Sequence, residues 1–156
     1  MFVRSRTQGL VRYRERRSTM NTSVGDGMEW ISALSNPNSI LAVYRSSAPT
    51  LAGVRIHEVC LNRDGPTLRL RFDLGTVPDN LPEKWRREGL NVVQLEVLFG
   101  GLSKVSLGHF STDAVCDLEI RKGDSVRIAA KSDSISLAGV AETATVVRIS
   151  AYADSR

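Results

Sequence analysis

The chain has 156 residues, of which 42% are hydrophobic and 24% are charged, a balance typical of a soluble globular domain. A chain of this length buries enough surface to fold as one domain without a disulfide or a metal staple. Its apolar runs are too short to span a bilayer, and its two cysteines are too few for a disulfide framework. We therefore expect one cytoplasmic domain, with Cys60 and Cys116 as free, buried thiols.

The basic character of the chain is confined to its N-terminal end. The net charge is +4, but residues 1–19 hold six Arg and one Glu, so the remainder carries −1. We interpret residues 1–27 as a basic disordered extension and linker, in preference to a transit peptide or a functional basic arm. Translation would then start at one of three methionines: Met1, Met20 or Met28. Residues 28–156 form the predicted domain, and they show no basic stripe that would indicate nucleic-acid binding.

Two short helical segments are expected at the start of this domain. Trp30, Ile31 and Leu34 fall at helical spacing, and the Asn-Pro pair at 36–37 then interrupts the pattern. A second short helix would begin at the Asn-Ser pair at 38–39, which supplies capping side chains, and run to Tyr44. We expect Trp30 and Tyr44 to cover one face of a sheet.

Beyond Pro49 the hydrophobic pattern has a period near two. Residues 67–74 and 92–99 alternate cleanly, as half-buried antiparallel strands do. Further strands are predicted at 54–61, 102–110, 114–120, 126–130, 135–139 and 143–152. About eight short strands with turn signals between them predict a mainly β fold (α+β by count), an antiparallel sandwich or a partly open barrel.

Local breaks in the alternation give finer predictions. The phase slips at the His-Glu pair at 57–58, which indicates a β-bulge, and Asn62 to Pro66 has the composition of a hairpin turn. In the last strand, one face is expected to carry Thr145, Val147, Ile149 and Ala151. If residues 67–74 and 92–99 are neighbouring strands, Arg69 and Arg71 can pair with Glu96 across them.

No set of residues has the spacing of a catalytic or metal site. His57, Cys60, His109 and Cys116 include no Cys-x-x-Cys or His-x-x-x-His pair, so no metal is expected. Both cysteines lie in strand patterns and are interpreted as structural rather than as nucleophiles. The sequence contains no Gly-x-Ser-x-Gly motif and no phosphate-binding glycine loop, so neither an enzyme nor a cofactor is predicted.

The loop at 75–91 is the candidate binding segment. Pro78 and Pro82 stiffen it, and Trp85 is of the residue type most enriched at binding hot spots. An alternative is that the Trp85 ring folds inward and plugs an open end of the β structure. The alternating charges around it are read as solvated. The candidate partner-binding residues are Asp79, Glu83, Lys84, Trp85, Arg86 and Glu88.

Two motifs carry a resemblance to a known family. They are Arg-Asp-Gly-Pro at 63–66, ahead of an alternating strand, and Pro-x-x-x-Pro-x-Lys-Trp at 78–85. With the strand at 92–98 and the ending Val-Arg-Ile-Ser-Ala-Tyr at 147–152, they make residues 29–152 resemble the immunity protein 50 family. These are bacterial proteins encoded beside polymorphic toxins. The resemblance implies stoichiometric binding of a cognate toxin domain, without turnover.

One observation on charge and one alternative function accompany this expectation. A domain charge of −1 does not provide the strongly negative face that inhibitors of nucleases often carry. A small β-barrel or sandwich that binds a small molecule in its interior is the alternative function, and it predicts a sizeable apolar pocket with a few convergent polar groups.

Overall fold

The computed structural model describes residues 22–45 and 47–155, with side chains from residue 27 onward. The basic segment at 1–19 and the candidate start residues Met1 and Met20 lie outside the described residues. The described elements are α2 (Thr22–Ser32), α3 (Asn38–Tyr44), β1 (Val54–Asn62), β2 (Thr67–Asp73), α4 (Glu83–Arg87), β3 (Val92–Gly100), β4 (Lys104–Phe110), β5 (Val115–Cys116), β6 (Leu118–Lys122), β7 (Val126–Lys131), β8 (Ile135–Ala141) and β9 (Thr143–Tyr152).

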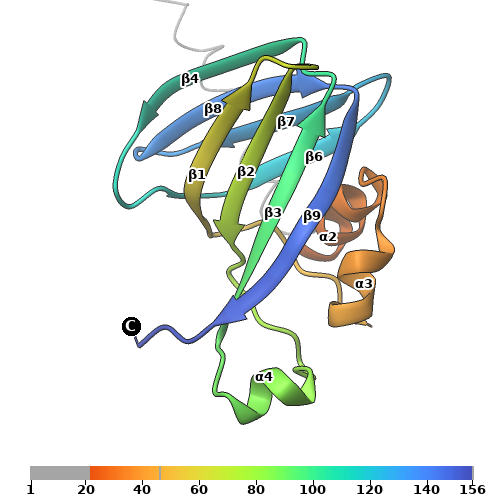
Figure 1. Cartoon of the computed structure of the whole chain (residues 1–156), viewed down its shortest axis with the longest axis vertical. Coiled ribbons are helices and arrows are strands. Elements are labelled where there is room, and N and C mark those ends of the chain that lie inside the picture. Colours follow the sequence, from red (N-terminus) through yellow and green to blue (C-terminus); the bar gives the residue numbers. More distant parts are fainter. Residues whose placement is uncertain (1–21, 46, 156) are drawn as a thin grey trace, which may run out of the picture.

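The strands form two antiparallel sheets that pack face to face. Sheet A has the order β5-β1-β2-β3-β9, and sheet B has the order β4-β8-β7-β6. Figure 1 shows sheet A in front of sheet B, with α2 and α3 beside β9 and α4 projecting at one end. The predicted mainly β fold is confirmed, and of the two architectures proposed it is the sandwich, because the sheets are separate.

The alternation of β2 and β3 builds the centre of the core. Leu70 pairs with Val97 and Phe72 pairs with Leu95, and all four side chains are fully buried between the sheets. Burial of such side chains is the main favourable contribution to folding, about 1.5–3 kcal/mol for each one. The predicted bulge in β1 is confirmed, because the register with β2 shifts between Ile56 and Glu58.

The phase predicted for β9 is wrong at its start. Ala144 and Val146 face the core, whereas Val147 is 49% exposed. The register with β3 shifts so that Glu96 pairs with Arg148 and Val97 with Val146, which leaves Val147 as a bulge residue. A bulge exchanges the two faces of a strand, so alternation read through it assigns one half incorrectly.

The single strand expected at 114–120 is two strands in different sheets. The chain crosses from sheet A to sheet B at Asp117, whose carboxylate accepts a hydrogen bond from the Gly53 N–H at 2.9 Å. The next residue, Leu118, donates its N–H to the Leu51 carbonyl at 2.9 Å. These bonds fix the corner, and they explain why the structure has one strand more than the sequence indicates.

The helices cover one side of the sandwich. Helix α2 begins at Thr22, within the stretch interpreted as linker, and Trp30 and Tyr44 are buried as expected. The predicted capping of α3 by Asn38 and Ser39 is wrong, because the N-cap residue is Pro37 and makes no side-chain cap bond. Proline is tolerated there because the first turn of a helix needs no N–H partner.

The loop between α2 and α3 closes part of the edge of sheet A. Ser35 donates its N–H to the Ala144 carbonyl at 2.8 Å. The Asn36 side chain donates to the Val146 carbonyl at 2.8 Å and accepts from the Val146 N–H at 2.9 Å. These two residues therefore act as a short additional strand along the first half of β9.

Candidate functional site

The candidate binding segment is a loop with a short helix at its tip. Helix α4 spans Glu83–Arg87 and follows Pro82, whose carbonyl accepts the Arg86 N–H at 3.0 Å. The helix ends at Arg87, and Gly89 follows its C-cap residue with a φ of +69°, which suits a residue without a side chain. Figure 1 shows α4 beyond the ends of β2 and β3.

Both ends of this loop are held firmly. The buried Tyr44 hydroxyl donates to the Thr76 carbonyl at 3.0 Å, and burial raises the pKa of Tyr44, so the group stays a neutral donor. At the other end, the Asn91 side chain forms two hydrogen bonds with the backbone of Asp154, at 2.9 and 2.7 Å. The Asn91 N–H also bonds to the Tyr152 carbonyl at 3.0 Å. The tip is thus presented from a fixed base.

Five of the six residues selected from the sequence lie in α4 or at its C-cap, and Asp79 lies earlier in the same loop. Trp85 is partly buried and packs against the core, as the plug interpretation expects. Its neighbours project into solvent: Asp79, Glu83, Lys84, Arg86 and Glu88 are all exposed. No ion pair joins these charges to any side chain in the described part of the chain. They form a mixed-charge surface that is available for contact.

A second polar cluster, which the sequence analysis did not identify, surrounds Asp73 on the outer face of sheet A. Asp73 is 6% exposed, and His57 lies with Nε2 2.7 Å from its Oδ2. Tyr152 donates its hydroxyl to the same oxygen at 2.5 Å, and Gln94 donates its amide to Oδ1 at 2.9 Å. A carboxylate held by this many donors is well compensated for its burial.

The signal for this cluster was present but needed the strand order. Asp73 ends the polar face of β2, and His57 is the extra residue at the bulge in β1. Only the pairing of β2 with β3 and of β3 with β9 brings Gln94 and Tyr152 to the same place. The cluster contains the Asp73 carboxyl group and the His57 imidazole but no thiol, because Cys60 contacts Arg69 instead.

Beside this cluster, ion pairs cover the outer face of sheet A. The predicted pairing is confirmed for Arg69, which contacts Glu96 at 2.9 Å, while Arg71 contacts Glu58 at 3.3 Å and Gln94 at 3.5 Å. Hydrogen bonds to Cys60 and Glu96 raise the pKa of Arg69. Ion pairs on a solvated sheet face contribute little to stability, so they keep the face soluble rather than hold it together.

The two cysteines differ in their surroundings. Cys116 is buried as expected, and burial, assisted by the charge of Asp117, raises its thiol pKa to about 11. The expectation is wrong for Cys60, which is only partly buried because it pairs with Arg69 on the polar face of β1 and β2. Within residues 22–45 and 47–155, no group of three or more His, Cys, Asp or Glu could hold a metal ion.

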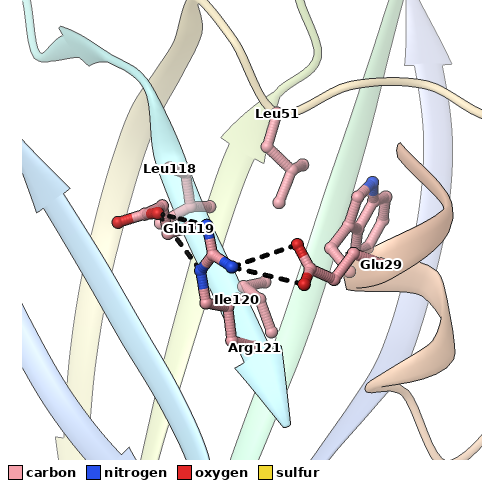
Figure 2. A pocket seen from close by; sticks show the side chains of 7 residues that line it. Glu29, Leu51, Leu118, Glu119, Ile120 and Arg121 are labelled. Atoms are coloured by element: carbon pink, nitrogen blue, oxygen red, sulfur yellow. Dashed lines mark hydrogen bonds and ion pairs between the residues drawn. The ribbon is translucent and has the colours of Figure 1, made fainter. Parts of the chain in front are cut away.

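A small pocket lies where α2 meets β6. Its volume is about 30 Å³, which is room for little more than a water molecule. Figure 2 shows the Arg121 guanidinium between Glu29 of α2 and Glu119 of β6. The N–O distances are 3.2 Å to Glu29 and 3.0 Å to Glu119. Arg121 therefore links α2 to β6 through an exposed ion pair, and the pocket beneath it is a packing feature rather than a ligand site.

A larger hollow, of about 600 Å³, lies on the outer face of sheet B and not in the interior. Its outward-facing lining residues are Lys104, Ser106, Arg127, Ala129, Ala138 and Val140. The interior is filled by large side chains such as Trp30, Phe72 and Phe99. These two hollows give no support to the alternative of a small molecule held inside the sandwich.

Comparison with known families identifies a match over most of the chain. The model of the family described as immunity protein 50 matches residues 36–152, close to the range of the resemblance seen in the sequence. Searches of curated proteins and of solved structures found no match. In the described part of the chain, no helix combines the length and the apolar character that crossing a membrane requires. Because the family model covers most of the chain, the protein belongs to the immunity protein 50 family.

Proposed function

We propose that this protein neutralises a cognate bacterial toxin by binding it directly, in the cytoplasm and without turnover. The observation that carries the proposal is the family match over residues 36–152. The surface of the α4 tip supports it, because its charged side chains are exposed and available for contact with another protein.

We further propose that the α4 tip forms part of the contact with the toxin. Its charges are exposed, and its base is held by hydrogen bonds at Thr76 and Asn91. A pre-organised segment loses little entropy on binding, so more of its contact energy appears as affinity. Trp85, flanked by Lys84 and Arg86, resembles the aromatic and Arg anchors found at binding hot spots.

The direct test is co-expression with the toxin domain encoded by the neighbouring gene. Cells should survive when both proteins are made, and the purified pair should form a complex of fixed stoichiometry. Toxin activity should fall linearly with added protein and reach its minimum at one equivalent, because each molecule occupies one toxin. Cells that die as quickly with the protein as without it would show that the proposal is wrong.

The α4 contact is tested by the double variant Lys84→Ala with Arg86→Ala, which spares the core. We expect the toxin to dissociate about tenfold faster, because the loss of anchor residues weakens a complex mainly by raising its dissociation rate. Lys122→Ala, an exposed cation on β6, is the matched control. Unchanged thermal unfolding of both variants would separate a binding effect from a folding effect. Equal toxin affinity of both variants would remove α4 from the interface.

A further inference from the structure

Strand β4 is an exposed sheet edge that no other described element covers. The other edges are covered or irregular. Strand β5 pairs with β1 only at Val54 and Arg55, and beyond them β1 has the bulge at His57 and the charge of Glu58. Strand β6 packs against α2, and the first half of β9 pairs with Ser35 and Asn36. The second half of β9 has the bulge at Val147 and the charge of Arg148, both of which discourage pairing. Strand β4 pairs only with β8, is exposed at all seven positions, and pairs regularly from Lys104 to Leu107 before its register shifts between Leu107 and Phe110.

One side of β4 is apolar although it is open to solvent. Val105, Leu107 and Phe110 are 37%, 44% and 45% exposed. Leu107 and Phe110 lie opposite Leu137 and Ile135 of β8, which are buried in the core, and residues directly opposite each other share a face of the sheet. Val105 lies opposite Gly139, two residues before Leu107 and so on the same face. These three side chains therefore lie on the core-facing side of sheet B but remain open to solvent. Exposed apolar groups in a row on a free edge are typical of a binding site.

The other side of β4 carries positive charge. Cross-strand pairing places Lys104, Val140 and Arg127 in one row, and Ser106, Ala138 and Ala129 in the next. The second row consists of small side chains, which leave the hollow of about 600 Å³. Neither Lys104 nor Arg127 has an acidic partner among the described residues, unlike the paired cations of sheet A.

We propose that β4 binds an extended strand of the toxin, which adds to sheet B along this edge. The strand would place apolar side chains against Val105, Leu107 and Phe110, and carboxylates beside Lys104 and Arg127. Backbone hydrogen bonds would supply affinity and the alternating side chains would supply specificity. This inference rests on the proposed function and adds a contact at the end of the molecule opposite α4 (Figure 1).

The positive charge beside β4 favours an acidic toxin strand over a second copy of β4 as the partner. Strand β4 contains Lys104 and His109 and no acidic residue. Pairing β4 with β4 of another copy would therefore bring no carboxylate to the unpaired cations of either copy. An acidic strand compensates them and also discriminates against self-association.

The test uses three single variants against the toxin domain encoded by the neighbouring gene. Lys104→Glu, which leaves the core untouched, and Leu107→Lys should each weaken toxin binding by about tenfold or more. Lys122→Glu, on the opposite edge of sheet B, is the matched charge reversal and should change affinity by less than about twofold. If wild-type protein protects cells and all three variants bind equally well, the β4 inference is wrong while the proposed function stands.

Amide hydrogen exchange gives a second readout that does not depend on side-chain changes. Toxin binding should slow exchange along Lys104–Phe110, because new backbone bonds form there. Three results would contradict the inference. One is unchanged β4 exchange in the complex. Another is a wild-type dimer that Leu107→Lys dissociates, which makes a second copy the occupant. The third is faster β4 exchange in the free protein after removal of residues 1–21, which makes that segment the occupant.

Discussion

Tyr152 donates its hydroxyl to the Asp73 carboxylate at 2.5 Å, and this bond joins β9 to β2. Strand β3 lies between the two, and its Gln94 also donates to Asp73. A single buried carboxylate thus connects three adjacent strands, and His57 connects a fourth. The outer, polar face of sheet A is therefore joined by a hydrogen-bond network around Asp73, which is separate from the apolar core between the sheets.

Removing this carboxylate should be costly. We expect Asp73→Ala to lower the free energy of unfolding by about 3 kcal/mol, because three donors lose a buried acceptor. Tyr152→Phe should cost about 1 kcal/mol. The matched control is Asp113→Ala, whose carboxylate pairs with Arg55 but is 73% exposed, and it should cost less than about 1 kcal/mol. Urea unfolding measures all three, and equal losses would show that Asp73 is not a special site.

The Cys116 thiol should make stability depend on alkaline pH. Its pKa is about 11 in the folded protein against 9.0 ordinarily, so the unfolded chain loses the proton first as pH rises. The folded state then binds more protons than the unfolded state, and stability falls between about pH 9 and 11. Cys116→Ala should lose less stability across that window than the wild type. Urea unfolding at several pH values tests this, and parallel pH curves for the two proteins would contradict it.

The two thiols should also differ in their reaction with Ellman's reagent. Cys60 is partly exposed and Cys116 is buried, so one equivalent should react promptly in the folded protein and a second only on unfolding. Cys60→Ala should abolish the prompt phase. A prompt phase that survives this substitution would place the accessible thiol elsewhere.

The connection between β3 and β4 requires glycine at one position. Gly101 has a φ of +64°, and an added Cβ would also press on the Glu142 side chain. Because that side chain can move, the backbone conformation sets the cost, and Gly101→Ala should destabilise by about 1–2 kcal/mol. At Gly123 an added Cβ would meet nothing within 4 Å, so Gly123→Ala should be neutral or slightly stabilising. Thermal unfolding of the two variants checks the difference.

The amide of Asn36 should be essential to the covered half of β9. Asn36→Ala leaves the N–H and the carbonyl of Val146 without partners and should cost about 1–3 kcal/mol. Ser35→Ala removes a hydroxyl contact with Thr145 but keeps the backbone bond, so it should cost less than about 1 kcal/mol. Denaturant unfolding ranks the two, and the reverse order would contradict the role of Asn36.

The strands of this protein could be predicted from its sequence because most of them have one wet and one dry face. The bulge at His57 was readable since the apolar positions change phase on either side of it. The bulge at Val147 was not, because β-branched residues lie on both faces of β9 and mask the slip. An alternating pattern shows which residues of a strand are buried. Where both faces carry apolar residues, the pattern no longer shows which face is buried, and a shift in register cannot be predicted.

Features that depend on distant partners could not be predicted. The corner at Asp117 is fixed by bonds to Gly53 and Leu51, which are more than sixty residues away. The cluster at Asp73 gathers side chains from four strands, and no local pattern marks their meeting. The α4 tip could be recognised as a unit because its Pro, Trp and Gly signals all lie within one loop.

The position of β9 in sheet A also affects how the protein is made. Its strand partner β3 leaves the ribosome some fifty residues earlier, and until residues 143–152 follow, the edge of β3 that pairs with β9 has no strand partner. The nascent chain therefore carries an unpaired strand edge while residues 101–142 are made. Molecular chaperones act on such intermediates, so the late arrival of β9 makes its completion the step at which aggregation competes with folding.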